Sequence, residues 1–220
     1  RPNNKNILAT EETVEIMKIR YGKNYCESEQ RLNYNEKINI NGVEIKLIPA
    51  GHIIGSAQIY LEYKGEVTVV SGDYKTVADN LSTAFEPVKC HSFVTECTFG
   101  LPAFRWMAQE HVFGEINQWW AKNAALGAVS ILGAYGLGKA QRLLCGLDLS
   151  IGKVFTHSAV ERTNCVMRQQ GITLPETELI MPETDRKGQS GALIIAPPSA
   201  IGSIWSRRFG DTSSAFASGW

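Results

Sequence analysis

The sequence has no excess of charge of either sign. Its 220 residues include 22 basic and 22 acidic side chains, so the formal net charge with neutral histidine is zero. A protein that coats nucleic acid non-specifically needs a clear surplus of Lys and Arg, so this class of function is disfavoured. A nuclease with a small, locally shaped site is still allowed.

The sequence also lacks a long apolar run. No stretch approaches the roughly 18 apolar residues that a membrane helix needs, and the first residues show no basic segment followed by an apolar one. We therefore expect no membrane association. The chain opens on Arg1 and closes on an apolar stretch that ends at Trp220, and we interpret it as a piece of a longer protein.

Cysteine is scarce, and no two cysteines have the CxxC spacing. The five residues form an odd number, which favours a reducing compartment and hence the cytoplasm. Each cysteine is expected to be a small buried hydrophobic residue. With 44% hydrophobic residues, the chain is long enough for one large domain or two small ones.

The first hundred residues predict one helix followed mostly by antiparallel sheet. Thr10, followed by two glutamates, starts a helix that Gly22 ends. From Lys37 apolar residues alternate with polar ones, and the pair Asn41-Gly42 predicts a hairpin turn. Further strands are expected at residues 57–63, 66–70 and 93–96.

After Leu101 and Pro102, predicted helices alternate with predicted strands. This alternation is typical of a parallel, doubly wound sheet, and we place a domain boundary near residue 101. Helices are expected at residues 104–125, 137–147 and 159–170. Strands are expected at residues 128–134, 153–156 and 192–196, with a polar loop over 175–191.

Two polar residues each follow a strand and a glycine. His52 comes directly after Gly51, and Asp73 comes directly after Gly72. Glycine lets the backbone turn sharply, so the imidazole and the carboxylate would project from the edge of the sheet. These groups are common ligands of catalytic zinc, which normally takes three protein ligands. Taken alone, a histidine at a strand end is more often a hydrogen-bonded structural residue, and a Gly-Asp pair is more often a turn.

Three segments resemble the ordered motifs of the metallo-β-lactamase superfamily, in its β-CASP nuclease branch. They are AGHIIGSAQ (50–58), SGDYK (71–75) and TECTFG (95–100). Four later segments resemble the bacterial ligase-associated DNA exonucleases. They are GLGKAQR (136–142), HSAVER (157–162), APPS (196–199) and RRFGD (207–211).

The resemblance implies an α/β fold in two domains. Residues 1–100 would be part of a metallo-β-lactamase αββα sandwich, and residues 101–220 a β-CASP domain with a mostly parallel, Rossmann-like sheet. It also implies that His52 binds one zinc ion, that Asp73 bridges two, and that Glu96 supports the active-site histidines. For Glu96 the alternative is a cap on the following turn.

The resemblance places the other zinc ligands outside the chain. The family's His-x-His-x-Asp-His motif is expected shortly before Arg1, because Arg1-Pro2 resembles the segment that follows it. Two further histidine motifs are expected beyond Trp220. The full-length parent is therefore expected to bind two zinc ions, whereas this chain alone would bind zinc poorly and be inactive.

The implied activity is that of a zinc-dependent DNA exonuclease, with His52, Asp73 and Glu96 in the active site. Its expected partners are DNA, an ATP-dependent DNA ligase and a helicase. One alternative is a β-CASP ribonuclease of the RNA 3′-end-processing type. Another is a degenerate relative that binds nucleic acid without cutting it.

Candidate substrate-binding residues are all basic. Lys139 and Arg142 lie three apart at the start of a predicted helix, behind glycines that suit a phosphate. Arg207 and Arg208 could form a phosphate fork, and Lys75 is the last residue of the SGDYK segment that contains Asp73. The alternative for these residues is a solvated surface charge. We expect His157 to cap a helix or bond between domains, and Trp119 and Trp120 to pack in a core.

Overall fold

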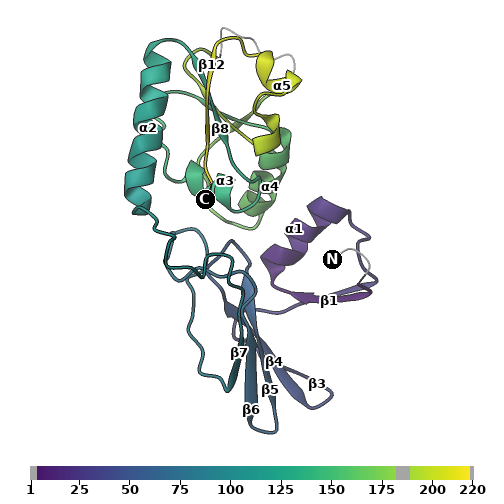
Figure 1. Cartoon of the computed structure of the whole chain (residues 1–220). Helices are drawn as coiled ribbons and strands as arrows, with labels where there is room; N and C mark the ends of the chain where they lie inside the picture. Colours follow the sequence, from purple (N-terminus) through teal and green to yellow (C-terminus); the bar gives the residue numbers. More distant parts are fainter. Residues whose placement is uncertain (1–3, 182–188, 219–220) are drawn as a thin grey trace. The chain divides into compact units, whose positions relative to one another are not determined.

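The computed structural model describes residues 4–181 and 189–218. The chain divides into two compact units, Arg1–Gly100 and Leu101–Trp220 (Figure 1). The expectation for Arg1-Pro2, and the middle of the predicted loop over 175–191, fall outside the described residues. The fold is α/β, with one mixed and one parallel five-stranded sheet.

The larger sheet of the first unit confirms the predicted hairpins. Its strands are ordered β3-β4-β5-β6-β7, with β3–β6 antiparallel and β7 parallel to β6. Asn41 and Gly42 have φ of 53° and 86°, as a type I′ turn requires. The bounds are β3 Ile38–Ile40, β4 Val43–Pro49, β5 Ala57–Tyr63, β6 Glu66–Val70 and β7 Ser92–Val94.

The first unit also contains the predicted helix and a small sheet that was not predicted. Helix α1 covers Glu11–Tyr21, and the Thr10 hydroxyl accepts from the Thr13 amide at 3.3 Å. Strands β1 (Asn6–Ala9) and β2 (Ser28–Arg31) pair in parallel. Strand β2 is entirely polar, so apolar periodicity gave no sign of it.

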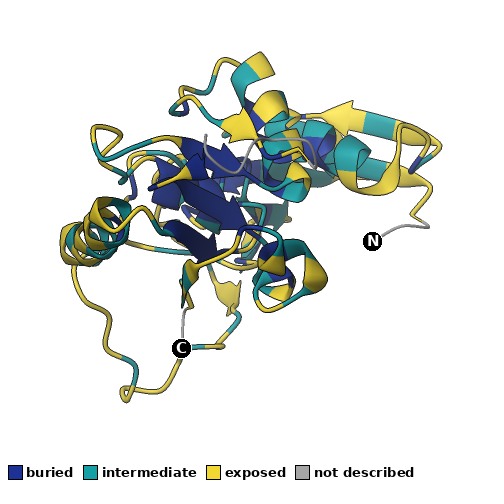
Figure 2. Cartoon of the chain, turned by 90° about the horizontal axis from the view of Figure 1, so that it is seen from above, coloured by how far each residue is buried: buried dark blue, intermediate teal, exposed yellow. Residues whose placement is uncertain are grey.

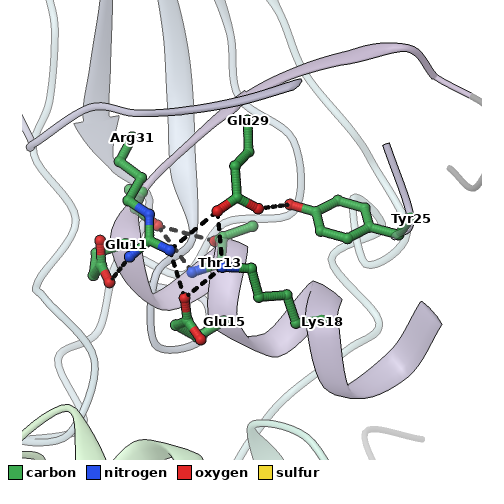
Figure 3. A network of polar contacts seen from close by, with 8 residues as sticks. Glu11, Thr13, Glu15, Lys18, Tyr25, Glu29 and Arg31 are labelled. Carbon is green, nitrogen blue, oxygen red and sulfur yellow. Dashed lines mark hydrogen bonds and ion pairs between the residues drawn. The ribbon is translucent and has the colours of Figure 1, made fainter. Parts of the chain in front are cut away.

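Charged side chains join α1 to β2 (Figure 3). The Arg31 guanidinium contacts Glu11, lies 2.7 Å from a Glu15 oxygen and 3.1 Å from a Glu29 oxygen. Lys18 lies 3.0 Å from Glu15 and 2.8 Å from Glu29. Hydrogen bonding to Lys18 lowers the pKa of both Glu15 and Glu29. The network therefore supplies polar contacts between α1 and the entirely polar strand β2.

The second unit contains the predicted parallel sheet, ordered β10-β9-β11-β8-β12 with every pair parallel. Two of its strands were not predicted. Strand β10 lies inside the expected polar loop, and β12 is made mostly of small polar residues. The bounds are β8 Val129–Gly133, β9 Val154–Thr156, β10 Glu178–Leu179, β11 Leu193–Ala196 and β12 Thr212–Phe216.

Helices cover both faces of the parallel sheet, as a doubly wound fold requires. On one face, Trp120, Leu144 and Val160 from three helices share a core cluster; on the other, Ala200 and Trp205 pack against a second cluster. Figure 2 shows the buried strands between these helices. The helices are α2 Gln109–Ala125, α3 Lys139–Leu144, α4 Ser158–Gln169, η2 Pro198–Ala200 and α5 Ile204–Arg207.

Some predicted details were wrong. Helix α2 begins at Gln109 rather than Phe104, and α3 has only six residues. None of the five cysteines forms a disulfide, and none is buried as predicted: Cys26 and Cys90 are half-buried, and Cys97, Cys145 and Cys165 are exposed. The prediction for Trp120 is confirmed, because its side chain is fully buried and donates to the Gly191 carbonyl at 2.9 Å. Among the described helices, none has the length and apolar character to cross a membrane.

Candidate metal centre

Three predicted site residues follow strands that run in the same direction. Strands β4 and β6 are both antiparallel to β5, and β7 is parallel to β6. The carboxyl ends of β4, β6 and β7 therefore share one edge of the sheet. His52, Asp73 and Glu96 each lie two or three residues beyond those ends. This topology brings residues that are 21 and 23 positions apart to one edge.

His52 and Asp73 approach each other at this edge. The His52 Nε2 and Asp73 Oδ2 atoms are 3.7 Å apart, with side chains 41% and 74% exposed. This separation is too long for a hydrogen bond. Two ligands of one tetrahedral zinc lie about 3.4 Å apart, given metal–ligand bonds of about 2.0–2.2 Å. The pair therefore fits two positions of a zinc site.

The described residues do not complete a metal site by themselves. Within 4–181 and 189–218, no group of three or more His, Cys, Asp or Glu side chains is placed to hold a metal ion. A catalytic zinc normally takes three protein ligands. His52 and Asp73 are thus a partial ligand set.

Gly51 lets the loop that carries His52 meet the loop that carries Asp73. Its φ is +69°, and a Cβ atom there would lie 2.3 Å from the Lys75 carbonyl oxygen and 2.9 Å from the Phe85 amide nitrogen. The Lys75 amide also donates to the Ala50 carbonyl at 3.0 Å. The two loops are therefore joined backbone to backbone, which only glycine permits at this position.

Hydroxyl groups fix the rest of the His52 loop, and sequence reasoning missed them. The Ser56 hydroxyl accepts from the backbone amides of His52 and Ile53, both at 3.1 Å. Thr10 and Thr13, at the start of α1, donate to the Gly55 carbonyl at 2.8 and 2.9 Å. Helix α1 therefore holds the loop in place, although about forty residues separate them in sequence.

Glu96 has the local contact of a capping residue. Its carboxylate accepts from the Thr98 amide at 2.7 Å, which is the alternative that the sequence left open. The contact fixes the turn that follows β7. A supporting role for Glu96 toward active-site histidines stays a prediction.

Lys75 forms an ion pair inside the first unit. Its ammonium contacts Asp79, whose side chain is 3% exposed, and Asp79 also accepts from the amides of Leu81 and Ser82 at 3.1 and 2.8 Å. Burial raises the pKa of Asp79, but Lys75 and these amides outweigh it, so the pKa lies below its usual value. This contact gives Lys75 a structural partner, and sequence reasoning did not anticipate Asp79.

We expect Asp79→Asn to lower the free energy of unfolding of the first unit by roughly 2–4 kcal/mol, because a buried charge pair loses one partner. Because folding lowers the pKa of Asp79, the stabilisation by its carboxylate is fully present above the unfolded-state pKa of about 3.9. This stabilisation is lost as the pH falls through the folded-state pKa. The difference between wild type and variant should therefore shrink in acid. Denaturant unfolding followed by amide hydrogen exchange in β4–β6 measures it.

The matched control is Asp73→Asn, which makes the same chemical change at an exposed side chain. Its effect on stability should stay within about 0.5 kcal/mol. Equal losses for the two variants would contradict the assigned role of Asp79.

In the second unit, a side chain of the protein already bonds the backbone polar groups of the glycine loop before α3. The Gly138 amide donates to the Gln141 side chain at 2.8 Å, and Gln141 donates to the Gly136 carbonyl at 3.1 Å. Helix α3 is also too short for a strong dipole. The expected phosphate cradle is therefore filled by Gln141. Lys139 lies over the Tyr135 ring at 5.4 Å, and Arg142 donates to Gln109.

The other basic candidates lie around α5. Arg208 lies 5.2 Å from the ring centre of Trp205 and 4.7 Å from that of Phe209. Arg207 is exposed, with a long 3.5 Å contact to the Gly202 carbonyl. The capping prediction for His157 is confirmed, since its Nδ1 accepts from the Ala159 amide at 3.1 Å.

The chain is similar to parts of longer proteins whose names refer to the joining or cleavage of nucleic acid. No protein-family model matches it. It is 28% identical to a "Probable DNA ligase" of Opitutus terrae over 97% of the chain and 21% of the ligase. It is 25% identical to "Cleavage and polyadenylation specificity factor subunit 3" of Dictyostelium discoideum over 56% of the chain and 16% of that protein. It is 29% identical to "Endoribonuclease ysh-1" of Neurospora crassa, over 56% of the chain and 15% of that protein.

The chain therefore spans between 15 and 21% of the length of these curated relatives. The names of the cleavage factor and of the endoribonuclease agree with a nuclease, and the name of the ligase agrees with a protein that acts on DNA.

Proposed function

We propose that this chain is part of a zinc-dependent phosphodiester hydrolase that degrades DNA as an exonuclease. The observation that carries the proposal is the approach of His52 Nε2 to within 3.7 Å of Asp73 Oδ2 at one sheet edge. In this proposal residues 1–100 belong to a metallo-β-lactamase domain and residues 101–220 to a β-CASP domain. The remaining ligands for two zinc ions come from the rest of the parent protein.

The exposed positions of His52 and Asp73 support a role in binding. Bound zinc would lower the pKa of a water molecule, and its positive charge would stabilise the phosphate. The Asp73 carboxylate projects from a loop and is 74% exposed, so its second oxygen is open to another ligand. The Ser56 hydroxyl holds the backbone at His52 and so limits the motion of the imidazole. In the proposal Glu96 keeps a supporting role and binds no metal.

The similarity to a probable DNA ligase over 97% of the chain favours DNA. It supports a protein that works alongside an ATP-dependent DNA ligase, with a helicase as a further expected partner. The endoribonuclease relative favours a second candidate, a β-CASP ribonuclease of the RNA 3′-end-processing type. That similarity covers only 56% of the chain, so we place it second. A degenerate relative that binds nucleic acid without cutting it is the third.

Digestion of matched strands by the full-length parent tests the proposal. We expect end-labelled single-stranded DNA to be degraded from one end, because an exonuclease releases short products first. Removal of metal with a chelator should stop the reaction, and added zinc should restore it. Cleavage of the matching RNA alone would select the ribonuclease. Binding without cleavage, by a parent that holds its metal, would select the degenerate relative.

A further inference from the structure

The second unit has its own topological switch point, at the carboxyl ends of β9 and β11. These strands are neighbours in the parallel sheet. The chain leaves β9 through α4, whose Val160 packs in the cluster on one face; it leaves β11 through η2 and α5, which pack in the cluster on the other face. Ligands of open α/β sheets bind in the crevice where neighbouring strands send the chain to opposite faces.

Aromatic and basic side chains meet at this point. His157 directly follows β9, and its amide donates to the Ile195 carbonyl at 2.9 Å. Its ring lies edge-to-face with that of Trp205, and the two ring centres are 4.9 Å apart. Trp205 in turn contacts Phe209 at 4.9 Å. Arg208 lies against both of these rings. Packing on two aromatic rings restricts Arg208, so less conformational freedom is lost when it binds a ligand.

The positive charge at this edge has no protein counterpart among the described residues. Arg162 on α4 is exposed and Arg208 is half-buried. In residues 4–181 and 189–218, neither forms an ion pair with a carboxylate. Burial lowers the pKa of His157, and Arg208 and Arg162 lower it further. Both guanidinium groups therefore lie within electrostatic reach of the His157 ring.

The N-terminus of α4 adds to this positive potential. The helix has 12 residues and begins directly after His157. Its dipole places partial positive charge at that end, where anions are favoured. The Ala159 and Val160 amides are already bonded to His157, so the helix contributes its dipole and neither of these donors. The two arginines at the switch point therefore carry the site.

We propose that this edge binds a backbone phosphate of single-stranded nucleic acid through Arg162 and Arg208. Guanidinium groups pair with phosphate oxygens in a fork, whatever the base. Binding should therefore be independent of sequence. The choice of nucleic acid as the source of the phosphate rests on the proposed function. The site itself uses none of the metal-centre residues.

Fluorescence anisotropy of the 220-residue chain with short, labelled single-stranded DNA tests this site. A chelator is present throughout, so the metal centre contributes nothing, and failure of hydrolysis leaves this test intact. We expect Arg162→Gln and Arg208→Gln each to weaken binding about 3- to 10-fold. Each lost phosphate contact should also reduce the slope of log affinity against log salt by about 0.7. Arg208→Lys should retain more of the affinity than Arg208→Gln.

The matched control is Arg20→Gln. Arg20 also lies over an aromatic ring, that of Tyr21 at 5.6 Å, but in the first unit. The proposal is overturned if Arg162→Gln and Arg208→Gln bind like wild type, or if Arg20→Gln weakens binding equally. Arg162 is exposed, so its variant keeps the test valid if Arg208→Gln unfolds. Inorganic phosphate or a mononucleotide that binds as tightly as the strand would also overturn it, in favour of a small-phosphate site.

Discussion

Asp73→Ala in the full-length parent is expected to abolish metal-dependent cleavage of DNA and to leave the fold intact. The Asp73 carboxylate projects at the carboxyl edge of the mixed sheet, 74% exposed and 3.7 Å from His52. In the proposed metal centre this carboxylate would hold two metals, so its loss would remove their clamp on the phosphate. We expect cleavage to fall by about 10³-fold or more. End-labelled DNA in a single-turnover assay measures the rate, and elemental analysis measures bound zinc.

Glu66→Ala provides the control for Asp73→Ala. Glu66 is also an exposed acid, with a side chain 77% exposed, but it begins β6 and so lies at the opposite edge of the same sheet. Its removal should leave cleavage and zinc content unchanged. If Asp73→Ala retains cleavage, the assignment of this edge as the metal centre is wrong. If it loses cleavage only because it unfolds, amide exchange in β4–β6 will show this directly.

The sequence was most informative where local chemistry alone determines local structure. The Asn41-Gly42 turn was predicted because both residues accept the positive φ that a type I′ turn needs. The edge position of His52 and Asp73 was predicted because each follows a glycine at the end of an apolar strand. The helix before that sheet was equally readable from Thr10, whose hydroxyl accepts from the Thr13 amide.

Prediction failed where a long-range contact replaces an apolar pattern. Strand β2 has no hydrophobic residue and is held by parallel pairing and by the charges around Arg31 (Figure 3). Strand β12 is a mostly polar edge strand that pairs with the buried β8. Tertiary context decides such strands, and intrinsic propensity does not reveal them.

The same limit applies to the candidate sites. The glycines before α3 looked like a phosphate loop, but Gln141 occupies the Gly138 amide and also bonds Asn164 at 2.8 Å. Asn164 lies 23 residues away on α4, and no local pattern connects the two. Lys75 likewise looked available for substrate until the fold buried Asp79 beside it. Whether a polar side chain is free for a ligand depends on which partners the fold supplies.

Gly51→Ala is expected to cost the first unit roughly 3–5 kcal/mol of stability, close to the largest effects of single substitutions. Two penalties combine. Any residue with a Cβ atom loses about 1–2 kcal/mol in the left-handed region, where Gly51 lies at φ +69°. Its Cβ would also lie 2.3 Å from the Lys75 carbonyl oxygen, and this neighbour is backbone, which cannot turn aside. The loop that carries His52 must then separate from the loop that carries Asp73.

Gly65→Ala separates the two penalties. Gly65 has φ +83°, but a Cβ atom there would meet nothing within 4 Å, so only the conformational cost of about 1–2 kcal/mol should remain. Every tryptophan lies at Trp106 or later, so tryptophan fluorescence reports the second unit, while amide exchange in β4–β6 reports the first. Gly51→Ala should weaken exchange protection far more than Gly65→Ala and leave the fluorescence transition unchanged. Equal losses in the two variants would mean that the two loops are not held together at Gly51, and the approach of His52 to Asp73 would lose its structural basis.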